Sequence, residues 1–149
     1  MPIVVVREFE VPAAPAAVLD YLKDFGHTEQ WDPGTRQTTR TGTGPITVGT
    51  TWHNESRFLG VTSRLTYTLC ELTAERLVFI GRNEGATSTG TITVRPVEGG
   101  SHLSYHLNLV MHGLAKLATP VLKIEFEKLG TETVARLTEV LGKLGAQAR

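Results

Sequence analysis

The fold is decided by one stretch, residues 119–144, which reads TPVLKIEFEKLGTETVARLTEVLGKL. Its apolar residues recur at steps of three and four and its charged residues mostly take the other positions, which predicts one long amphipathic helix. Thr119 and Pro120 predict the cap and the first residue of this helix. Gly130 lies within it, at a cost of about 1 kcal/mol relative to alanine. The predicted apolar face comprises Val121, Leu122 or Ile124, Phe126, Leu129, Val134, Leu137, Leu141 and Leu144.

The chain ahead of this helix mostly has the alternating pattern of strands. Residues 3–10 predict a first strand that is buried at its start, because residues 3–6 are apolar on both faces, and half-exposed at its end. Residues 12–31 predict short helices, which stop at Asp32 because a residue before proline is pushed out of the α region. Glycine-rich turns separate the remaining strands. These are predicted at residues 35–40, 50–58, 61–72, 77–82, 87–95 and 103–111.

This order of elements predicts an α+β fold. We expect a curved antiparallel sheet of about six or seven strands around a long C-terminal helix, with two short helices after the first strand. The concave apolar face of such a sheet must be buried, and the last helix is the only large element left to cover it. One helix rarely fills such a concavity, so we expect a cavity, although close packing explains the helical stripe equally well. Residues 1–149 form one predicted domain, without internal repeats or long linkers.

Composition narrows the class of protein further. The 15 acidic and 15 basic residues give a formal net charge of zero, and the absence of a basic run argues against nucleic-acid binding. The single cysteine, Cys70, excludes an intramolecular disulfide and fits a reducing compartment. No stretch has the roughly 18 apolar residues of a membrane span, and residues 1–7 lack the basic segment of a signal peptide. We expect a cytoplasmic monomer or homodimer with no integral membrane association.

A family resemblance is carried by residues 9–18, FEVPAAPAAV, which lead to Asp24 and then to residues 31–33, WDP. Together with the element order, they resemble the SRPBCC superfamily, which comprises START, Bet v 1-like and polyketide cyclase/dehydrase proteins, and most of all its bacterial polyketide cyclase/dehydrase-like branch. The resemblance covers nearly the whole chain. It implies the helix-grip fold, with an internal pocket for hydrophobic or aromatic molecules. Because members cyclise or dehydrate polyketides, carry lipids or sense hormones, it implies a ligand rather than a reaction.

The sequence contains no set of residues with the spacing of a catalytic or metal site. His102 and His106 lie on a predicted strand, where their Cα atoms are roughly 13 Å apart, too far for one metal ion. His27 and His53 are isolated candidates for a general base, a role that most lone histidines do not have. Cys70 lacks the signature of an activated thiol, so we expect it to be buried and inert. The catalytic residues stay unassigned, and we expect neither a metal nor a cofactor.

The inward faces of the predicted strands and helix give a candidate pocket lining. It is apolar apart from Asn54, Tyr67 and Tyr105, and a few polar groups in an apolar wall are typical of small-molecule sites. The alternative is that these residues fill the core, with the tyrosine hydroxyls bonded to backbone. Trp31 is interpreted as an anchor for the short helices. The predicted ligand-binding residues are Trp52, Asn54, Phe58, Leu65, Tyr67, Leu69, Tyr105, Leu107, Phe126 and Leu129.

Two functions are compatible with such a pocket. The first is binding of a small hydrophobic or aromatic molecule, lipid- or polyketide-like, without covalent chemistry. The alternative is a polyketide cyclase or dehydratase that uses the same cavity, because positioning a reactive chain needs few polar groups. A third function, regulation of another protein through a surface contact, has no sequence feature for or against it.

Overall fold

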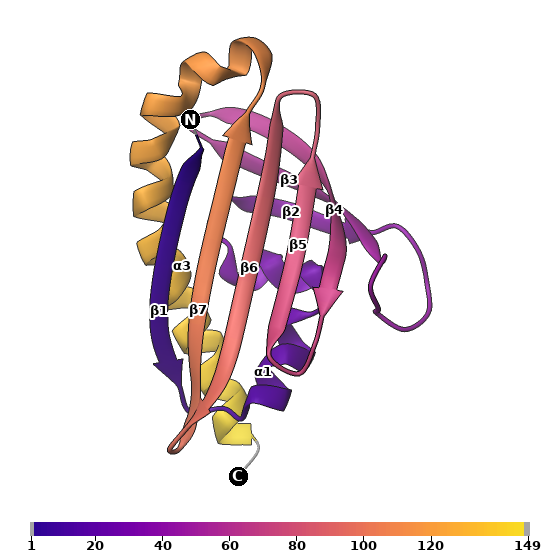
Figure 1. Ribbon diagram of the computed structural model, residues 1–149, viewed down its shortest axis with the longest axis vertical. Helices are drawn as coiled ribbons and strands as arrows, with labels where there is room; N and C mark the ends of the chain where they lie inside the picture. Colours follow the sequence, from indigo (N-terminus) through magenta and orange to yellow (C-terminus); the bar gives the residue numbers. More distant parts are fainter. Residues whose placement is uncertain (1, 148–149) are drawn as a thin grey trace.

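The computed structural model describes residues 2–147 and consists of a seven-stranded antiparallel sheet with one long helix (Figure 1). The strand order is β1-β7-β6-β5-β4-β3-β2, so each strand from β2 to β7 pairs with its neighbour in the chain and β1 joins the free edge of β7. The predicted α+β helix-grip architecture is confirmed. The strands are β1 Ile3–Val11, β2 Thr35–Arg40, β3 Thr51–Phe58, β4 Val61–Leu72, β5 Arg76–Arg82, β6 Ala86–Val97 and β7 Gly100–Met111.

Short helices follow the first strand, as the sequence predicts. They are α1 (Pro15–Leu22), the 3₁₀ turn η1 (Phe25–His27) and α2 (Thr28–Trp31). Pro15 occupies the first turn of α1, where its missing N–H removes no hydrogen bond. Helix α2 ends at Trp31 because Asp32, which precedes a proline, has an extended backbone with φ −93° and ψ 111°.

The long C-terminal helix, α3, covers Thr119–Gln147. A 3₁₀ segment, η2 (Gly113–Ala118), leads directly into it. Thr119 has φ −52° and ψ −48°, which is helical, so the prediction that Thr119 is a non-helical cap is wrong. The reason is that the residues before it are already helical, and they leave no extended residue to act as a cap.

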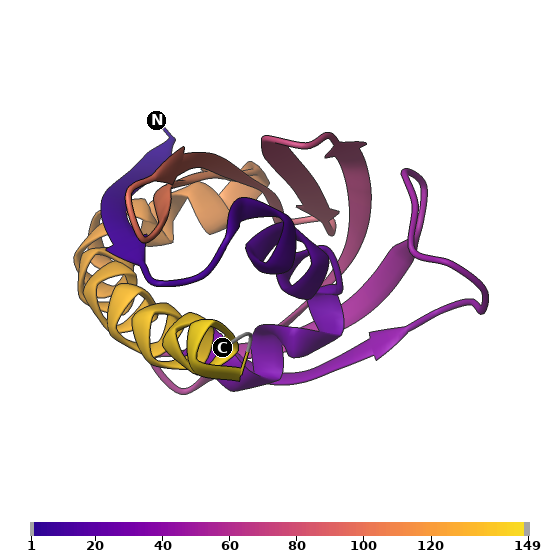
Figure 2. The same ribbon diagram turned by 90° about the horizontal axis from the view of Figure 1, so that it is seen from below.

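The sheet curves, and α3 lies along its first strand. Register shifts interrupt the β2–β3 pairing between Thr35 and Gln37 and the β4–β5 pairing between Leu69 and Glu71. Such bulges bend a strand and increase its twist. Helix α3 packs mainly against β1 and also touches α2, so that it spans from one edge of the curved sheet to the short helices. Figure 2 shows this ring of elements from the end where α1 lies.

Packing is denser around the C-terminal half of α3 than around its N-terminal half. The larger hydrophobic cluster combines Leu137 and Leu141 of that half with α1, η1 and α2 and with buried strand residues such as Trp52 and Leu103. The smaller cluster consists of Ile3, Val5, Ala86 and Leu109, with Leu122 and Phe126 partly buried against it. The helix therefore closes one end of the concavity and leaves room toward the other.

Three expectations about burial are wrong. Val4 and Val6 are 40% and 45% exposed, because nothing in the described chain covers the outer face of β1. Cys70 is exposed for the same reason, since it follows the strand alternation onto the outer face of β4. Val121 and Ile124 are exposed on α3, whereas Leu122 packs inward. The outer face of the sheet thus carries more apolar surface than the sequence pattern predicts.

Candidate functional site

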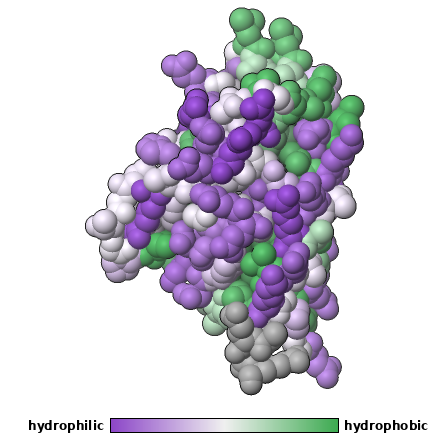
Figure 3. Space-filling model, turned by 180° about the vertical axis from the view of Figure 1, so that it is seen from behind, coloured by the Kyte–Doolittle hydropathy of each residue, from purple (hydrophilic) through white to green (hydrophobic). Residues whose placement is uncertain are grey.

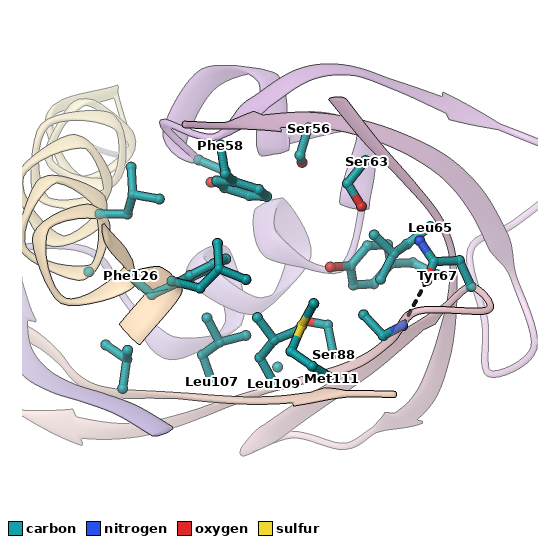
Figure 4. A pocket seen from close by; sticks show the side chains of 18 of the residues that line it. Ser56, Phe58, Ser63, Leu65, Tyr67, Ser88, Leu107, Leu109, Met111 and Phe126 are labelled. Atoms are coloured by element: carbon teal, nitrogen blue, oxygen red, sulfur yellow. Dashed lines mark hydrogen bonds between the residues drawn. The ribbon is translucent and has the colours of Figure 1, made fainter. Parts of the chain in front are cut away.

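A cavity of about 670 Å³ lies between the concave face of the sheet and the N-terminal half of α3. Strand β7 lines it with every second residue, Tyr105, Leu107, Leu109 and Met111. These residues extend along the strand for about 20 Å at roughly 3.3 Å per residue. Figure 4 shows Phe126 entering from α3, Phe58 from β3, and the Tyr67 ring pointing into the cavity from β4. Side chains of the long helix and of the sheet thus face one another across an internal space.

The mouth of this cavity is mostly apolar. It lies between the β3–β4 turn and the start of β4, which carry Leu59 and Val61, and the η2 segment with the start of α3. Leu114 and Leu117 of η2 are 88% and 81% exposed. Figure 3 shows apolar side chains gathered at this end of the molecule. An exposed apolar patch of this kind is typical of the entrance to a site for apolar ligands or of a contact surface.

Seven of the ten residues predicted to bind a ligand lie on the cavity wall, and three do not. Trp52 and Leu69 are fully buried in the larger hydrophobic cluster. Asn54 is also buried, and its side chain is hydrogen-bonded to neighbouring side chains. The seven on the wall are Phe58, Leu65, Tyr67, Tyr105, Leu107, Phe126 and Leu129.

The four histidines considered from the sequence lie outside the cavity wall. The His27 ring stacks on Tyr21 at a centroid distance of 4.2 Å, and His53 is exposed on β3. His102 lies 3.1 Å from the Glu8 carboxylate on the outer face of the sheet. His106 follows four residues later on the same face of β7. Within residues 2–147, no three His, Cys, Asp or Glu side chains gather in a way that could hold a metal ion. The same part of the chain has no helix with the length and apolarity of a membrane span.

The cavity has a polar group that the sequence analysis missed. Asp32, which the sequence identifies as a helix terminator and as part of the family motif but not as a ligand contact, lies on the cavity wall together with Tyr67 and Tyr105. Trp31 also lines the cavity, and its ring meets the Tyr105 ring edge-on at a centroid distance of 6.2 Å. Their position at the end of α2, within the WDP motif, was the available signal, because no periodic pattern tells which way such side chains point.

Hydrogen bonds from residues that do not line the cavity hold the Asp32 carboxylate in place. Its Oδ1 accepts from the Gly34 backbone N–H at 3.0 Å, and its Oδ2 accepts from the Thr35 hydroxyl at 2.9 Å. The Asn54 side-chain amide donates to the same Thr35 hydroxyl at 3.1 Å, and Asn54 Oδ1 accepts from Ser56 at 2.7 Å. A chain of hydrogen bonds thus runs from β3 through β2 to the carboxylate. Asn54, predicted as a ligand contact, instead supports Asp32 through Thr35.

Burial shifts the pKa values of the polar groups on the wall. Burial raises the pKa of the Asp32 carboxyl, and the hydrogen bonds from Gly34 and Thr35 and the charge of Arg136 only partly oppose this. Burial also raises the pKa of Tyr67 to about 12, which the neighbouring Ser88 hydroxyl partly offsets. The pKa of Tyr105 is raised by burial, then by the charge of Asp32. Both tyrosines therefore remain neutral hydrogen-bond donors at ordinary pH.

The Tyr105 hydroxyl is a free donor in the cavity. Within residues 2–147 it makes no hydrogen bond, whereas most buried tyrosine hydroxyls find a partner. Tyr105 also meets Trp31, the neighbour of Asp32 in the chain, with ring centroids 6.2 Å apart, and Asp32 lines the same cavity as both tyrosines. The cavity wall thus offers a carboxylate that can accept a proton and a phenol that can donate a hydrogen bond.

A helix-grip protein with an apolar cavity and a small polar group in its wall is the class that this structure defines. The family comparison agrees, since residues 2–142 match the model described as "Polyketide cyclase / dehydrase and lipid transport". The chain belongs to this family, within the polyketide cyclase-like branch of the SRPBCC superfamily. Among curated proteins, no sequence relative was found.

Solved structures confirm the fold at low sequence identity. The Zhui aromatase/cyclase from Streptomyces sp. R1128 has a TM-score of 0.79 and 13% identity, over 100% of this chain and 97% of that one. A START superfamily protein from Mycobacterium smegmatis has a TM-score of 0.71 and 14% identity, over 98% and 99%. A STAR-related lipid transfer protein from Xanthomonas axonopodis has a TM-score of 0.71 and 14% identity, over 93% and 85%. At these identities, the similarity is one of fold.

Proposed function

We propose that this protein binds a small hydrophobic or aromatic molecule, lipid- or polyketide-like, in the cavity between the sheet and α3. The observation that carries the proposal is the cavity itself, whose volume of about 670 Å³ lies in the ordinary range of small-molecule sites. Its wall is mostly apolar, and its polar side chains come from the α2–β2 segment, from β3, β4, β6 and β7, from the β5–β6 turn and from α3. Burial of apolar ligand surface at about 25 cal/mol per Å² provides the driving force.

The family and the composition support the same kind of partner. The family description joins polyketide cyclases and dehydrases to lipid transport, and both activities concern apolar molecules. The formal net charge of zero supports a small ligand over a nucleic acid. The single cysteine suits a reducing compartment, and we place the protein in the cytoplasm as a monomer or homodimer.

A pair of leucine substitutions on β6 tests the cavity. Gly90 lines it, and a Cβ atom added there meets nothing within 4 Å, so the side chain of Gly90→Leu begins in open space and should occupy part of the cavity. Thr91→Leu adds a leucine to the opposite face of the same strand and is the matched control. With the fluorescent apolar probe N-phenyl-1-naphthylamine, we expect Gly90→Leu to weaken binding about tenfold or more and Thr91→Leu to leave it unchanged. If both variants bound the probe equally well, the cavity would not be the binding site.

The natural ligand can be identified by native mass spectrometry of the protein purified from its own host. A bound hydrophobic molecule would name the chemical class, and extraction would allow its structure to be determined. We expect Gly90→Leu, purified in the same way, to carry less of that molecule. A protein that is empty and also ignores N-phenyl-1-naphthylamine would contradict the proposal.

A second candidate function, cyclisation or dehydration of a polyketide-like chain, is favoured by Asp32. A carboxylate with a raised pKa is a stronger base than an exposed one, and it shares the cavity wall with the Tyr105 hydroxyl, which is free to bond a substrate carbonyl. The structurally similar Streptomyces protein is named an aromatase/cyclase. Turnover of a synthetic poly-β-keto thioester, compared between the wild type and Asp32→Asn, separates the candidates. Catalysis predicts product formation faster than the uncatalysed reaction without protein, and the variant should lose this acceleration, whereas a binding protein gives none.

A further inference from the structure

The polar side chains of the cavity wall differ in depth. Three polar residues are near the mouth: Ser63 and Arg64 at the start of β4, and Asn83 just after the end of β5. Along β7, Met111 is nearest to the mouth and Tyr105 is farthest from it. The two residues are six positions apart, which is about 20 Å along a strand. Trp31, whose ring meets Tyr105, belongs to the dense cluster that closes this end. A ligand that enters through the mouth therefore meets Tyr105 with its leading end.

Asp32 and Tyr105 offer complementary hydrogen-bonding groups at this closed end. Each Asp32 oxygen already accepts one hydrogen bond from Gly34 or Thr35, but a carboxylate oxygen has two acceptor sites, so each retains one. The Tyr105 hydroxyl has no partner within the described residues and remains available as a donor. The two groups share this end of the cavity, because Trp31, which precedes Asp32 in the chain, meets the Tyr105 ring at a centroid distance of 6.2 Å. A single ligand hydroxyl complements both groups, because it donates to a carboxylate and accepts from a tyrosine.

We infer that Asp32 and Tyr105 form a polar anchor that binds a phenolic or enolic hydroxyl at the leading end of an aromatic ligand. The inference rests on the proposed function, since it names the chemical class that the cavity takes. The phenol O–H donates to an Asp32 oxygen, and its oxygen accepts from the Tyr105 O–H. Thr35 and Asn54 are positioning residues, because they hold the carboxylate toward the cavity and do not line it themselves.

A flat ring system in front of the anchor is consistent with the aromatic side chains around it. Phe25 stacks on Tyr67 at a centroid distance of 4.3 Å, and Trp31 presents its edge to Tyr105. All four side chains line the cavity. Aromatic rings gain from offset stacking and edge-to-face contacts beyond the area that they bury. The closed end therefore favours an aromatic hydroxyl compound over a saturated alcohol of similar length.

Two probes of nearly equal size test the anchor. 1-Hydroxypyrene carries the hydroxyl and 1-methylpyrene carries a methyl group in its place, and both are followed by fluorescence anisotropy. We expect the wild type to bind 1-hydroxypyrene about tenfold more tightly, which corresponds to roughly 1.4 kcal/mol. Asp32→Asn and Tyr105→Phe should each remove most of this preference, and 1-methylpyrene should still bind to both variants. Asp20→Asn and Tyr21→Phe, which alter residues outside the cavity wall, are the matched controls.

The outcomes separate the anchor from the cavity. Equal affinity of the wild type for the two probes, or a preference that survives both Asp32→Asn and Tyr105→Phe, would overturn the anchor while the cavity proposal stands. If neither pyrene binds the wild type, the cavity proposal fails and the anchor fails with it. Binding of 1-methylpyrene also reports that a variant is folded. If Asp32→Asn does not fold, the nearly isosteric Tyr105→Phe decides the question alone.

Discussion

Gly130 of α3 and Val5 of β1 are in such close contact that position 130 has no room for a methyl group. A Cβ atom added to Gly130 would lie 2.7 Å from Val5 Cγ1 and 3.3 Å from Arg7 Nη2. The same Arg7 nitrogen donates to the Glu127 backbone carbonyl and carboxylate, each at 3.0 Å. The glycine, which costs helix stability by itself, thus allows α3 to lie directly on the first strand beside the cavity.

Replacing this glycine should destabilise the protein even though alanine is the better helix former. We expect Gly130→Ala to lower the free energy of unfolding by roughly 1–3 kcal/mol, because the clash with Val5 outweighs a gain of about 1 kcal/mol in helix propensity. Gly142→Ala is the matched control in the same helix, since an added Cβ meets nothing within 4 Å. It should stabilise by roughly 0.5–1 kcal/mol. Urea unfolding measures both, and a stabilised Gly130→Ala would contradict the close contact.

The sequence predicted the faces of the strands well but not the boundary between cavity and core. Alternation with a period of two correctly placed Trp52, Leu65, Tyr67 and Leu69 on the concave side. It could not tell that Leu65 and Tyr67 line the space while Trp52 and Leu69 are packed. That difference depends on where α3 and the short helices lie over the sheet, and hydrophobic periodicity carries no information about it.

Asp32 illustrates a second limit of the sequence. The residue before a proline has a predictable backbone, and the extended conformation at Asp32 was correctly anticipated. The direction of its side chain depends on hydrogen bonds from Gly34 and Thr35, and Thr35 is itself held by Asn54 of another strand. Such a contact between distant segments is formed only in the folded chain. The place of Asp32 in the candidate site was therefore beyond prediction, whereas Tyr67, Tyr105 and most of the apolar wall were predicted.

In the native protein, the tyrosine hydroxyls should lose their protons only at an unusually high pH. All three in the sequence, Tyr21, Tyr67 and Tyr105, have a raised pKa, chiefly because burial disfavours the phenolate, and for Tyr21 and Tyr67 the value is about 12. The unfolded chain has tyrosines near 10, so the folded state holds more protons above that pH and stability falls as pH rises through this range. We expect tyrosinate absorbance to appear only together with alkaline unfolding. Full ionisation near 10 in a still-folded protein would contradict their burial.

The hydrogen bond from Thr35 should lower the pKa of the Asp32 carboxyl. The hydrogen bond from the Thr35 hydroxyl favours the charged carboxylate, so Thr35→Val should raise the Asp32 pKa beyond its already raised value. Thr39→Val is the matched control, because Thr39 is an exposed residue of the same strand. Carbon-13 NMR of labelled aspartate measures the pKa directly. An unchanged Asp32 titration in Thr35→Val would show that this hydrogen bond does not act on the carboxylate.

The stability of the protein should reveal the cost of burying Asp32. The pKa of Asp32 is raised in the folded state, whereas it is about 3.9 in the unfolded chain. At a pH between these two pKa values, the native protein binds more protons than the unfolded chain. Wild-type stability therefore loses a contribution as pH rises through that window, and the loss is complete above the folded pKa. Asp32→Asn keeps an acceptor for Gly34 but has no charge to bury.

We accordingly expect Asp32→Asn to be more stable than the wild type near neutral pH, with a difference that shrinks as the pH is lowered toward about 4. Asp20→Asn removes an exposed carboxylate from α1 and should change stability by less than about 0.5 kcal/mol near neutral pH. Urea unfolding across the pH range measures all three proteins. A variant that is less stable than the wild type at neutral pH, or a difference that grows on acidification, would mean that the surrounding donors stabilise the Asp32 carboxylate more than burial penalises it.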